Sequence, residues 1–344
     1  MKTYKANCCD NEVEVNVTEN SVVKLCCTQC GKVMFSFPGA EEKAHTRKVN
    51  NSPLLLKQGT SAMLLGKYQI IKKISEGTFA KVYLAYDPDR NERVALKLLK
   101  FKKYTQKKRK SEMSRSFVNY FIREAQILLE LNHHNIVKVK DTGNINGNPY
   151  LSMDYIPGKT LDEAVDELYS DYSMQLLIIH RLASALEYGY ENFKIIHRDI
   201  KPQNVIMHRD QGNMPMLVDF GLAKSLGNHY HALTLDGVIA GTPHFMPVEH
   251  FIQRDMDHRV DIYALGATLY FMATKHKPYY KITDVVDIMH AIKSGKLQPI
   301  RELNPDIPDP IVEIAGKAMA VEKEDRYADY AELKTKIEEA LTAL

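Results

Sequence analysis

The segment His197-Arg198-Asp199-Ile200-Lys201-Pro202-Gln203-Asn204, followed by Leu217-Val218-Asp219-Phe220-Gly221, decides the fold of this chain. Together these motifs supply two carboxylates, an amide and a lysine, the groups that phosphoryl transfer from a nucleotide requires. One carboxylate can accept a hydrogen bond from the attacking hydroxyl. The amide and the second carboxylate can ligate Mg²⁺, because this chemistry depends on positioning and charge neutralisation. A lone Asp-Phe-Gly is usually a turn, but both motifs in this order make chance a poor explanation.

Upstream, a turn of small residues lies between two predicted strands and could receive phosphate. It reads Ile74-Ser75-Glu76-Gly77-Thr78-Phe79-Ala80-Lys81-Val82. Small residues let backbone N–H groups approach phosphate oxygens, although with one glycine this segment by itself favours a plain hairpin turn. The strand Val94-Ala95-Leu96-Lys97 follows and ends in a lysine. A buried lysine needs a partner for its charge, and Glu124 on the next predicted helix is a candidate.

The hydrophobic periodicity predicts strands first and helices afterwards, which indicates an α+β protein with two lobes. Asn146-Gly147 is a hairpin signal between two of the strands. Strands are predicted at residues 68–75, 81–86, 93–99, 137–143 and 150–155, and helices at 173–193, 259–274 and 329–344 and around Phe117, Phe121, Leu128 and Leu131.

From residue 64 to residue 344 the chain resembles the protein kinase superfamily. Further matches are Gly241-Thr242-Pro243, the segment 261–266 and Arg326. Lys201, two residues after Asp199, fits the serine/threonine branch of the superfamily. The sequences of residues 266–270 and 323–327 are most similar to those of the eukaryotic-like serine/threonine kinases of bacteria. The resemblance implies a bilobal protein kinase fold, with a β-rich N-lobe and a helical C-lobe, that uses ATP and Mg²⁺ to phosphorylate protein substrates.

The resemblance also implies a role for each matching residue. Asp199 would be the catalytic base, Lys201 would steady the γ-phosphate, and Asn204 and Asp219 would ligate Mg²⁺. Lys97 would hold the α- and β-phosphates and pair with Glu124. The adenine would contact the side chains of Val82, Ala95, Ile206 and the gatekeeper Met153, and the backbone of Asp154 and Ile156. Thr242 would bridge Asp199 and Lys201. Glu249 would pair with Arg326.

Two departures from the kinase pattern stand beside these matches. Ser75 and Ala80 replace glycines of the phosphate loop, which should stiffen it, and Pro247-Val248-Glu249 replaces the usual Ala-Pro-Glu. The alternative function is a pseudokinase or scaffold, whose hallmark is the loss of a phosphate- or metal-handling residue. The full set is present and favours an active enzyme: Lys97, Glu124, Asp199, Asn204 and Asp219.

Arg198 suggests regulation through the activation loop, residues 223–240. In related kinases such an arginine binds a phosphate on this loop and orders it. The loop offers Ser225, Tyr230 and Thr234, and Thr234 is our predicted autophosphorylation site. Asp236 could act as a fixed negative charge or be an ordinary solvated acid.

All five cysteines (Cys8, Cys9, Cys26, Cys27 and Cys30) precede residue 31. Cys27-Thr28-Gln29-Cys30-Gly31 has the form of a zinc knuckle, Cys9 is the natural third ligand, and Cys8 or Cys26 would be the fourth. Residues 1–37, where two segments alternate polar and apolar, therefore partly resemble a zinc ribbon, followed by a linker at 38–63. A degenerate ribbon without metal and a redox role are the alternatives.

Composition excludes wholesale disorder and a membrane-spanning helix: hydrophobic residues make up 44% and charged residues 26%, without a long apolar run or a secretory signal. We expect a soluble, cytoplasmic protein. From Lys100 to Lys110 the chain carries seven basic residues and no acid, so subtracting these from the net charge of +3 leaves −4. Nucleic acid is thus not the expected partner. This basic segment is either a solvated loop, a docking site for an acidic partner or anionic surface, or an autophosphorylation site at Thr105 or Ser111.

Overall fold

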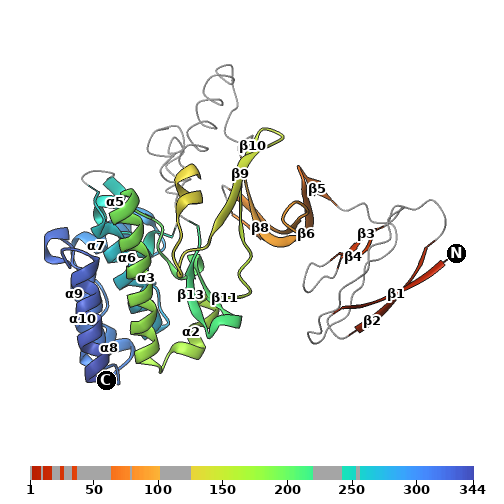
Figure 1. The fold of residues 1–344 in the computed structure, drawn as a ribbon. Helices are drawn as coiled ribbons and strands as arrows, with labels where there is room; N and C mark the ends of the chain where they lie inside the picture. Colours follow the sequence, from red (N-terminus) through yellow and green to blue (C-terminus); the bar gives the residue numbers. More distant parts are fainter. Residues whose placement is uncertain are drawn as a thin grey trace, which may run out of the picture. The chain divides into compact units, whose positions relative to one another are not determined.

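The computed structural model describes residues 2–8, 11–17, 24–26, 33–36, 63–77, 80–100, 125–219, 242–252 and 256–344. The chain divides into two compact units, one formed by Met1–Lys102 with Gly143–Tyr155 and the other by Lys103–Thr142 with Ile156–Leu344. The first is built of strands and the second mainly of helices (Figure 1). The sequence prediction of an α+β chain with a β-rich and a helical lobe is confirmed.

Two short antiparallel hairpins lie at the N-terminus. Strand β1 (Lys2–Cys8) pairs with β2 (Asn11–Val17), and β3 (Lys24–Cys26) pairs with β4 (Val33–Ser36). The alternating segments of the sequence are therefore strands. Cys8 lies opposite Asn11 and Cys26 opposite Val33, so these two cysteines lie at the closed ends of the two hairpins. Cys9, Cys27, Cys30 and residues 38–62 of the predicted linker lie outside the described residues.

The main sheet of the first unit has six strands in the order β5-β6-β7-β8-β10-β9. The turn between β9 and β10 has positive φ at Asn146 (52°) and Gly147 (82°), the conformation that an Asn-Gly hairpin predicts. The strands are β5 (Leu64–Leu65), β6 (Tyr68–Glu76), β7 (Ala80–Asp87), β8 (Glu92–Leu99), β9 (Val139–Ile145) and β10 (Asn148–Asp154).

One face of this sheet carries the hydrophobic core of the first unit. Tyr83 lies opposite Leu96, and Ala85 lies opposite Val94, so these side chains project to the same side. They pack in one buried cluster with Tyr68, Ile145 and Tyr150. Because side chains alternate along a strand, the residues between them, Val82, Ala95 and Lys97 among others, face the other side.

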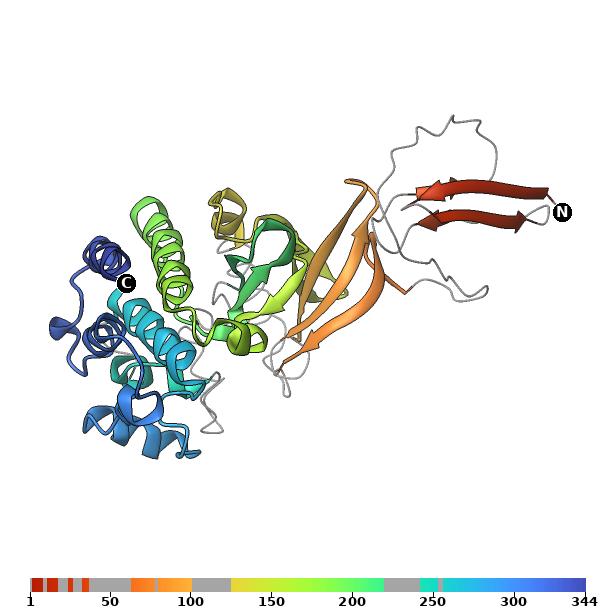
Figure 2. The ribbon, with the colours of Figure 1, turned by 90° about the horizontal axis from the view of Figure 1, so that it is seen from below.

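The second unit surrounds one fully buried helix. All residues of α6 (Arg259–Thr274) except the first are buried, and α6 packs against α3 (Tyr172–Phe193) and α9 (Asp309–Ala318) (Figure 1 and Figure 2). Helix α10 (Tyr330–Ala343) packs on α3 and α9. The other helices are α2 (Leu161–Leu168), α5 (Val248–Ile252), α7 (Val285–Lys293) and α8 (Ile300–Leu303), with 3₁₀ turns at Pro202–Asn204, Arg209–Gln211, Pro243–Phe245 and Lys323–Asp325.

The predicted helices at 173–193, 259–274 and 329–344 are confirmed within a residue at each end. Of the helix predicted around Phe117–Leu131, residues 125–130 are helical and those before residue 125 lie outside the described part. The sequence did not predict the three-stranded sheet of β11 (Gly158–Thr160), β12 (Val205–His208) and β13 (Met214–Leu217). Strands of three or four residues are too short to show a periodic pattern. No helix in the described ranges is long and apolar enough to span a membrane.

Candidate active site

Helix α6 fixes the backbone of the loop that carries Asp199. The amide N–H groups of His197 and Arg198 donate to the two carboxylate oxygens of Asp261, at 2.7 and 2.8 Å. Arg198 adopts a left-handed conformation with φ of 62°. This conformation is unfavourable for an L-residue, so contacts with the surrounding structure must offset its energetic cost. The two charge-assisted hydrogen bonds from a buried helix supply these contacts.

Asp261 is fully buried, and burial raises the pKa of its carboxyl to about 6. The hydrogen bonds from the amides of His197 and Arg198 oppose this rise because they favour the charged form. The hydroxyl of Tyr330, at the start of α10, donates to the same carboxylate at 3.4 Å and also favours the charged form. The C-terminal helix thus contributes to the group that holds the loop.

The predicted catalytic residues Asp199, Lys201 and Asn204 form one cluster. The Lys201 ammonium lies 3.1 and 3.3 Å from the two carboxylate oxygens of Asp199. The amide nitrogen of Asn204 donates to the backbone carbonyl of Asp199 at 2.7 Å and to its carboxylate at 3.0 Å. About 15% of the Asp199 side chain is exposed. A carboxylate that is fixed on one side and accessible on the other can accept a hydrogen bond from a substrate hydroxyl.

Asp219 follows strand β13 and is joined to the same cluster through the backbone. The N–H of Val218 donates to the carbonyl of Asn204 at 2.9 Å, so the two predicted Mg²⁺ ligands sit on neighbouring segments. The Asn204 amide nitrogen is turned toward Asp199, so its carbonyl oxygen is the atom that would bind the predicted metal.

Asn204 and Asp219 offer amide and carboxylate oxygens, the ligand types that magnesium prefers. Among the described residues no group of three or more His, Cys, Asp and Glu side chains could hold a metal ion. Mg²⁺ needs only one or two protein oxygens because it is shared with the phosphates of a nucleotide.

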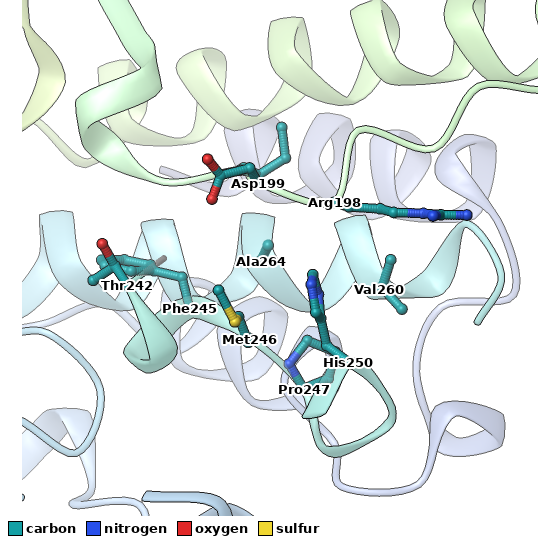
Figure 3. A pocket seen from close by; sticks show the side chains of 10 residues that line it. Arg198, Asp199, Thr242, Phe245, Met246, Pro247, His250, Val260 and Ala264 are labelled. Atoms are coloured by element: carbon teal, nitrogen blue, oxygen red, sulfur yellow. The ribbon is translucent and has the colours of Figure 1, made fainter. Parts of the chain in front are cut away.

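A pocket opens beside Asp199 (Figure 3). Asp199 and Arg198 point away from each other along the loop, and the His250 ring points toward the loop from α5 (Figure 3). Thr242 lines the same pocket, as its predicted role requires, while its bridge to Asp199 and Lys201 stays a prediction. The lining residues are Arg198, Asp199, Ile200, Thr242, Phe245, Met246, Pro247, His250, Val260 and Ala264.

The predicted nucleotide residues of the first unit share one face of its sheet. Val82 lies opposite both Lys97 and Ser75, and Ala95 lies opposite Met153, so their side chains project to the side away from the core. Asp154 lies opposite Val94 at the end of β10. Ile156 and Ile206 belong to the second unit, where Ile206 is a half-buried residue of β12.

Gly77 is not required by the packing of the protein. A Cβ built at this position would meet no atom within 4 Å, and φ is not positive there. Gly77 therefore leaves open space at the end of the β6–β7 hairpin, as a loop that receives phosphate needs. Ala80, at the start of β7, is buried.

The predicted pair of Glu249 and Arg326 is present. The two Nη atoms of Arg326 donate to the two carboxylate oxygens of Glu249 at 2.5 and 3.2 Å. Arg326 also donates to three backbone carbonyls, and its guanidinium lies 5.0 Å from the centre of the Tyr263 ring. The pair joins α5 to the turn before α10. Two other predicted residues, Glu124 and Thr234, lie outside the described residues.

Asp261 belongs to a motif that the sequence shows, but its contacts to the loop and its contact with Tyr330 were not predictable from the sequence. One signal was present: Asp261 is an acid near the start of a helix that is otherwise almost wholly apolar. Such an acid needs buried donors. The sequence does not say which donors these are, because they lie more than 60 residues away.

A model of the protein kinase domain matches residues 68–338, and the chain belongs to this family. It is 30% identical over 276 residues to the tyrosine-protein kinase MasK of Myxococcus xanthus, covering 76% of this chain and 41% of that protein. It is 30% identical over 279 residues to the serine/threonine-protein kinase PrkC of Bacillus subtilis, covering 81% of this chain and 41% of that protein. It is 32% identical over 306 residues to the serine/threonine-protein kinase PknD of Chlamydia felis, covering 80% of this chain and 31% of that protein.

The chain therefore spans less than half the length of these relatives. Among solved structures, the kinase domain of Mycobacterium tuberculosis PknI is similar with a TM-score of 0.61 and 22% identity, covering 81% of this chain and 98% of that one. PpkA-294 in its apo form is similar with a TM-score of 0.66 and 25% identity, covering 81% of this chain and 99% of that one. The PknI likeness supports the kinase fold alone.

Proposed function

We propose that this chain is an ATP-dependent protein kinase that transfers the γ-phosphoryl group to serine or threonine hydroxyls of protein substrates. The observation that carries the proposal is the cluster of Asp199, Lys201 and Asn204, held by Asp261 through the loop backbone. ATP with Mg²⁺ would supply the phosphoryl group and neutralise the charge that develops on it. Asn204 and Asp219 are the residues that would hold the metal.

In this mechanism the substrate hydroxyl oxygen bonds to the γ-phosphorus while the bond from that phosphorus to the bridging oxygen of ADP breaks. Asp199 accepts the hydrogen bond of the hydroxyl, orients its oxygen and takes up the proton as the new bond forms. The Lys201 ammonium, 3.1 Å from the Asp199 carboxylate, stabilises negative charge on the transferred group. Lys97 would bind the other two phosphates.

Serine/threonine specificity is the finer part of the proposal. The relatives include both a tyrosine kinase and serine/threonine kinases by name. Lys201, two residues after Asp199, favours serine and threonine, because the resemblance associates this position with that branch. We further propose that the chain phosphorylates itself at Thr234 and that Arg198 binds the resulting phosphate. Mass spectrometry of the chain after incubation with Mg–ATP tests both points, and phosphotyrosine alone, or an unmodified Thr234 in active protein, would contradict them.

The activity itself is tested by the transfer of labelled phosphate from Mg–ATP to a generic protein. We expect transfer by the wild type and a loss of about a hundredfold or more in Asp199→Asn and in Asp219→Ala, since each removes a group that acts on the reacting atoms. Asp210→Asn, an exposed acid of the same unit, is the control and should retain transfer. Absence of transfer by the wild type, even after incubation with ATP, would favour the scaffold alternative.

We also propose that residues 1–37 form a separate zinc-binding unit joined by the linker 38–63 to a kinase domain at 64–344. The position of Cys8 and Cys26 at the closed ends of two hairpins supports this, because a zinc ribbon draws its ligands from such turns. The ligands would be Cys9, Cys27 and Cys30 with Cys8 or Cys26. Such a unit would serve to bind a protein partner.

A further inference from the structure

The end of the β6–β7 hairpin is tied to the neighbouring strand β8 by one lysine. The ammonium of Lys100 donates to the backbone carbonyl of Gly77 at 2.8 Å and lies 2.7 Å from the carboxylate of Glu76. Leu99, the last residue of β8, lies opposite Ala80, so Lys100 follows directly beyond the paired region, beside the turn. Both contacts are made by residues of the same unit.

Glu76 completes this connection. Its second carboxylate oxygen accepts a hydrogen bond from Lys73 at 2.8 Å. The ammonium of Lys81 lies 3.7 Å from the first oxygen, the one that Lys100 contacts. One carboxylate thus contacts lysines that belong to β6, β7 and the residue after β8. Hydrogen bonds from Lys100 and Lys73 hold the pKa of Glu76 down, at about 2, so the carboxylate is charged over the whole physiological range.

These contacts hold the backbone of Gly77, a position where an added side chain would meet no neighbour. A Cβ added at Gly77 would meet no atom within 4 Å, while its N–H is bonded to the carbonyl of Ala80 at 2.9 Å and its carbonyl accepts from Lys100. A loop that is ordered before its ligand arrives loses less conformational entropy on binding. The three lysines also exceed the single acid in charge, which favours an approaching polyphosphate.

We propose that Lys100 and Glu76 are positioning residues that hold the backbone of Gly77, directly after β6, in the position that receives the phosphates of ATP. This inference rests on the proposed kinase function and adds a determinant of nucleotide affinity to it. It also gives a role to the first residue of the basic segment, which the sequence left open as a solvated loop. Residues 101–110 lie outside the described part of the chain.

The test measures the dissociation constants of Mg–ATP and AMP by calorimetry on the full chain. We expect Lys100→Gln and Glu76→Gln each to weaken Mg–ATP binding by about threefold to tenfold, the size expected of a partly exposed charged contact. AMP, which lacks the β- and γ-phosphates, should bind nearly as before. The double variant should be no worse than either single one, and Lys100→Arg should restore part of the affinity.

Lys72→Gln is the matched control, because it removes one positive charge from β6 without touching Glu76. Its Mg–ATP affinity should change by less than about twofold. The proposal is overturned if the two variants behave like this control, or if Glu76→Gln strengthens binding while Lys100→Gln weakens it. The second result would mean that Lys100 contacts the phosphate directly and Glu76 competes with it.

Failure of this inference and failure of the kinase proposal give different results. A wild type that binds Mg–ATP and transfers phosphate, with variants of unchanged affinity, would overturn the role of Lys100 alone. A wild type that binds Mg–ATP without transfer, and whose variants bind it more weakly, would keep the role of Lys100 and overturn the kinase. A wild type that does not bind Mg–ATP would overturn both.

Discussion

At the scale of single residues, burial raises the pKa of Asp261, and the hydroxyl of Tyr330 is one of the donors that oppose this rise. As the pH falls through about 6, the Asp261 carboxyl takes up a proton and loses acceptor strength toward the amides of His197 and Arg198. We therefore expect activity to fall on the acid side. Tyr330→Phe removes one donor to the carboxylate and raises the pKa of Asp261, so the acid limb should move up by about 0.5 to 1 pH unit.

The measurement is the pH dependence of kcat for the wild type and the variant. Tyr327→Phe is the control, because Tyr327 is an equally buried tyrosine of the same segment that does not contact Asp261. Equal shifts in both variants, or no shift in Tyr330→Phe, would show that the hydroxyl of Tyr330 does not act on Asp261.

Stability should show the opposite dependence on pH. The pKa of Asp261 in the folded chain, about 6, lies above its ordinary value of 3.8, so the folded state binds this proton more tightly than the unfolded state. The contribution of Asp261 to the free energy of unfolding is therefore fully present below pH 4 and falls by about 3 kcal/mol as the pH rises to about 6. The chain keeps a charged group that weakens the fold because its two oxygens shape the loop.

The sequence predicted Asp199, Lys201 and Asn204, which the structure brings together, and missed Tyr330, which contacts Asp261. Asp199, Lys201 and Asn204 are close in the chain, and their chemistry restricts their spacing, so a motif reveals them. Tyr330 reaches Asp261 only because α10 packs against the other helices of the second unit. A contact between residues so far apart in the chain leaves no recognisable spacing in the sequence.

At the scale of elements, the pair of Glu249 and Arg326 joins α5 to the turn before α10. No part of the Arg326 side chain is exposed, and its removal leaves the Glu249 carboxylate and three backbone carbonyls without their donor. We expect Arg326→Met to lower the free energy of unfolding by about 3 to 5 kcal/mol. Denaturant unfolding monitored by circular dichroism measures this loss.

The matched control is Lys334→Met, which breaks the pair of Lys334 and Glu187 between α10 and α3. That pair has the same 2.5 Å distance, but about a quarter of each side chain is exposed, so its loss should cost at most about 1 kcal/mol. Similar losses in the two variants would mean that burial does not decide the strength of these links.

The longest helices were predictable and the shortest strands were not. Helix α6 extends over residues 259–274 as the sequence predicts, because an almost uninterrupted apolar segment of this length is too long for a strand. Strands β11, β12 and β13 were missed, yet β12 and β13 form the hairpin between Asn204 and Asp219 and so bring the two predicted Mg²⁺ ligands to neighbouring segments. Their register is fixed by neighbouring strands and not by any local pattern.

At the scale of the whole molecule, the cysteine-containing segment and the residues predicted to act in phosphoryl transfer occupy separate parts of the sequence. All five cysteines precede residue 31, whereas the predicted nucleotide and catalytic residues lie between Ser75 and Asp219. A structural zinc site stabilises only the segment that its ligands fold. We therefore expect the full chain to bind about one zinc ion and to keep its phosphoryl transfer within about twofold after the zinc is removed.

Metal analysis of the purified chain, before and after treatment with a zinc-selective chelator in excess Mg²⁺, makes this measurement. The excess Mg²⁺ keeps the metal of the nucleotide in place, so any loss of transfer belongs to zinc. The double variant Cys27→Ser with Cys30→Ser should reproduce the chelated state, because two thiolates of the four are gone. Absence of zinc in the untreated chain would end the zinc proposal. Zinc release with a large loss of transfer would instead make the N-terminal unit a support of the kinase, since a separate unit can lose its metal without consequence for catalysis elsewhere.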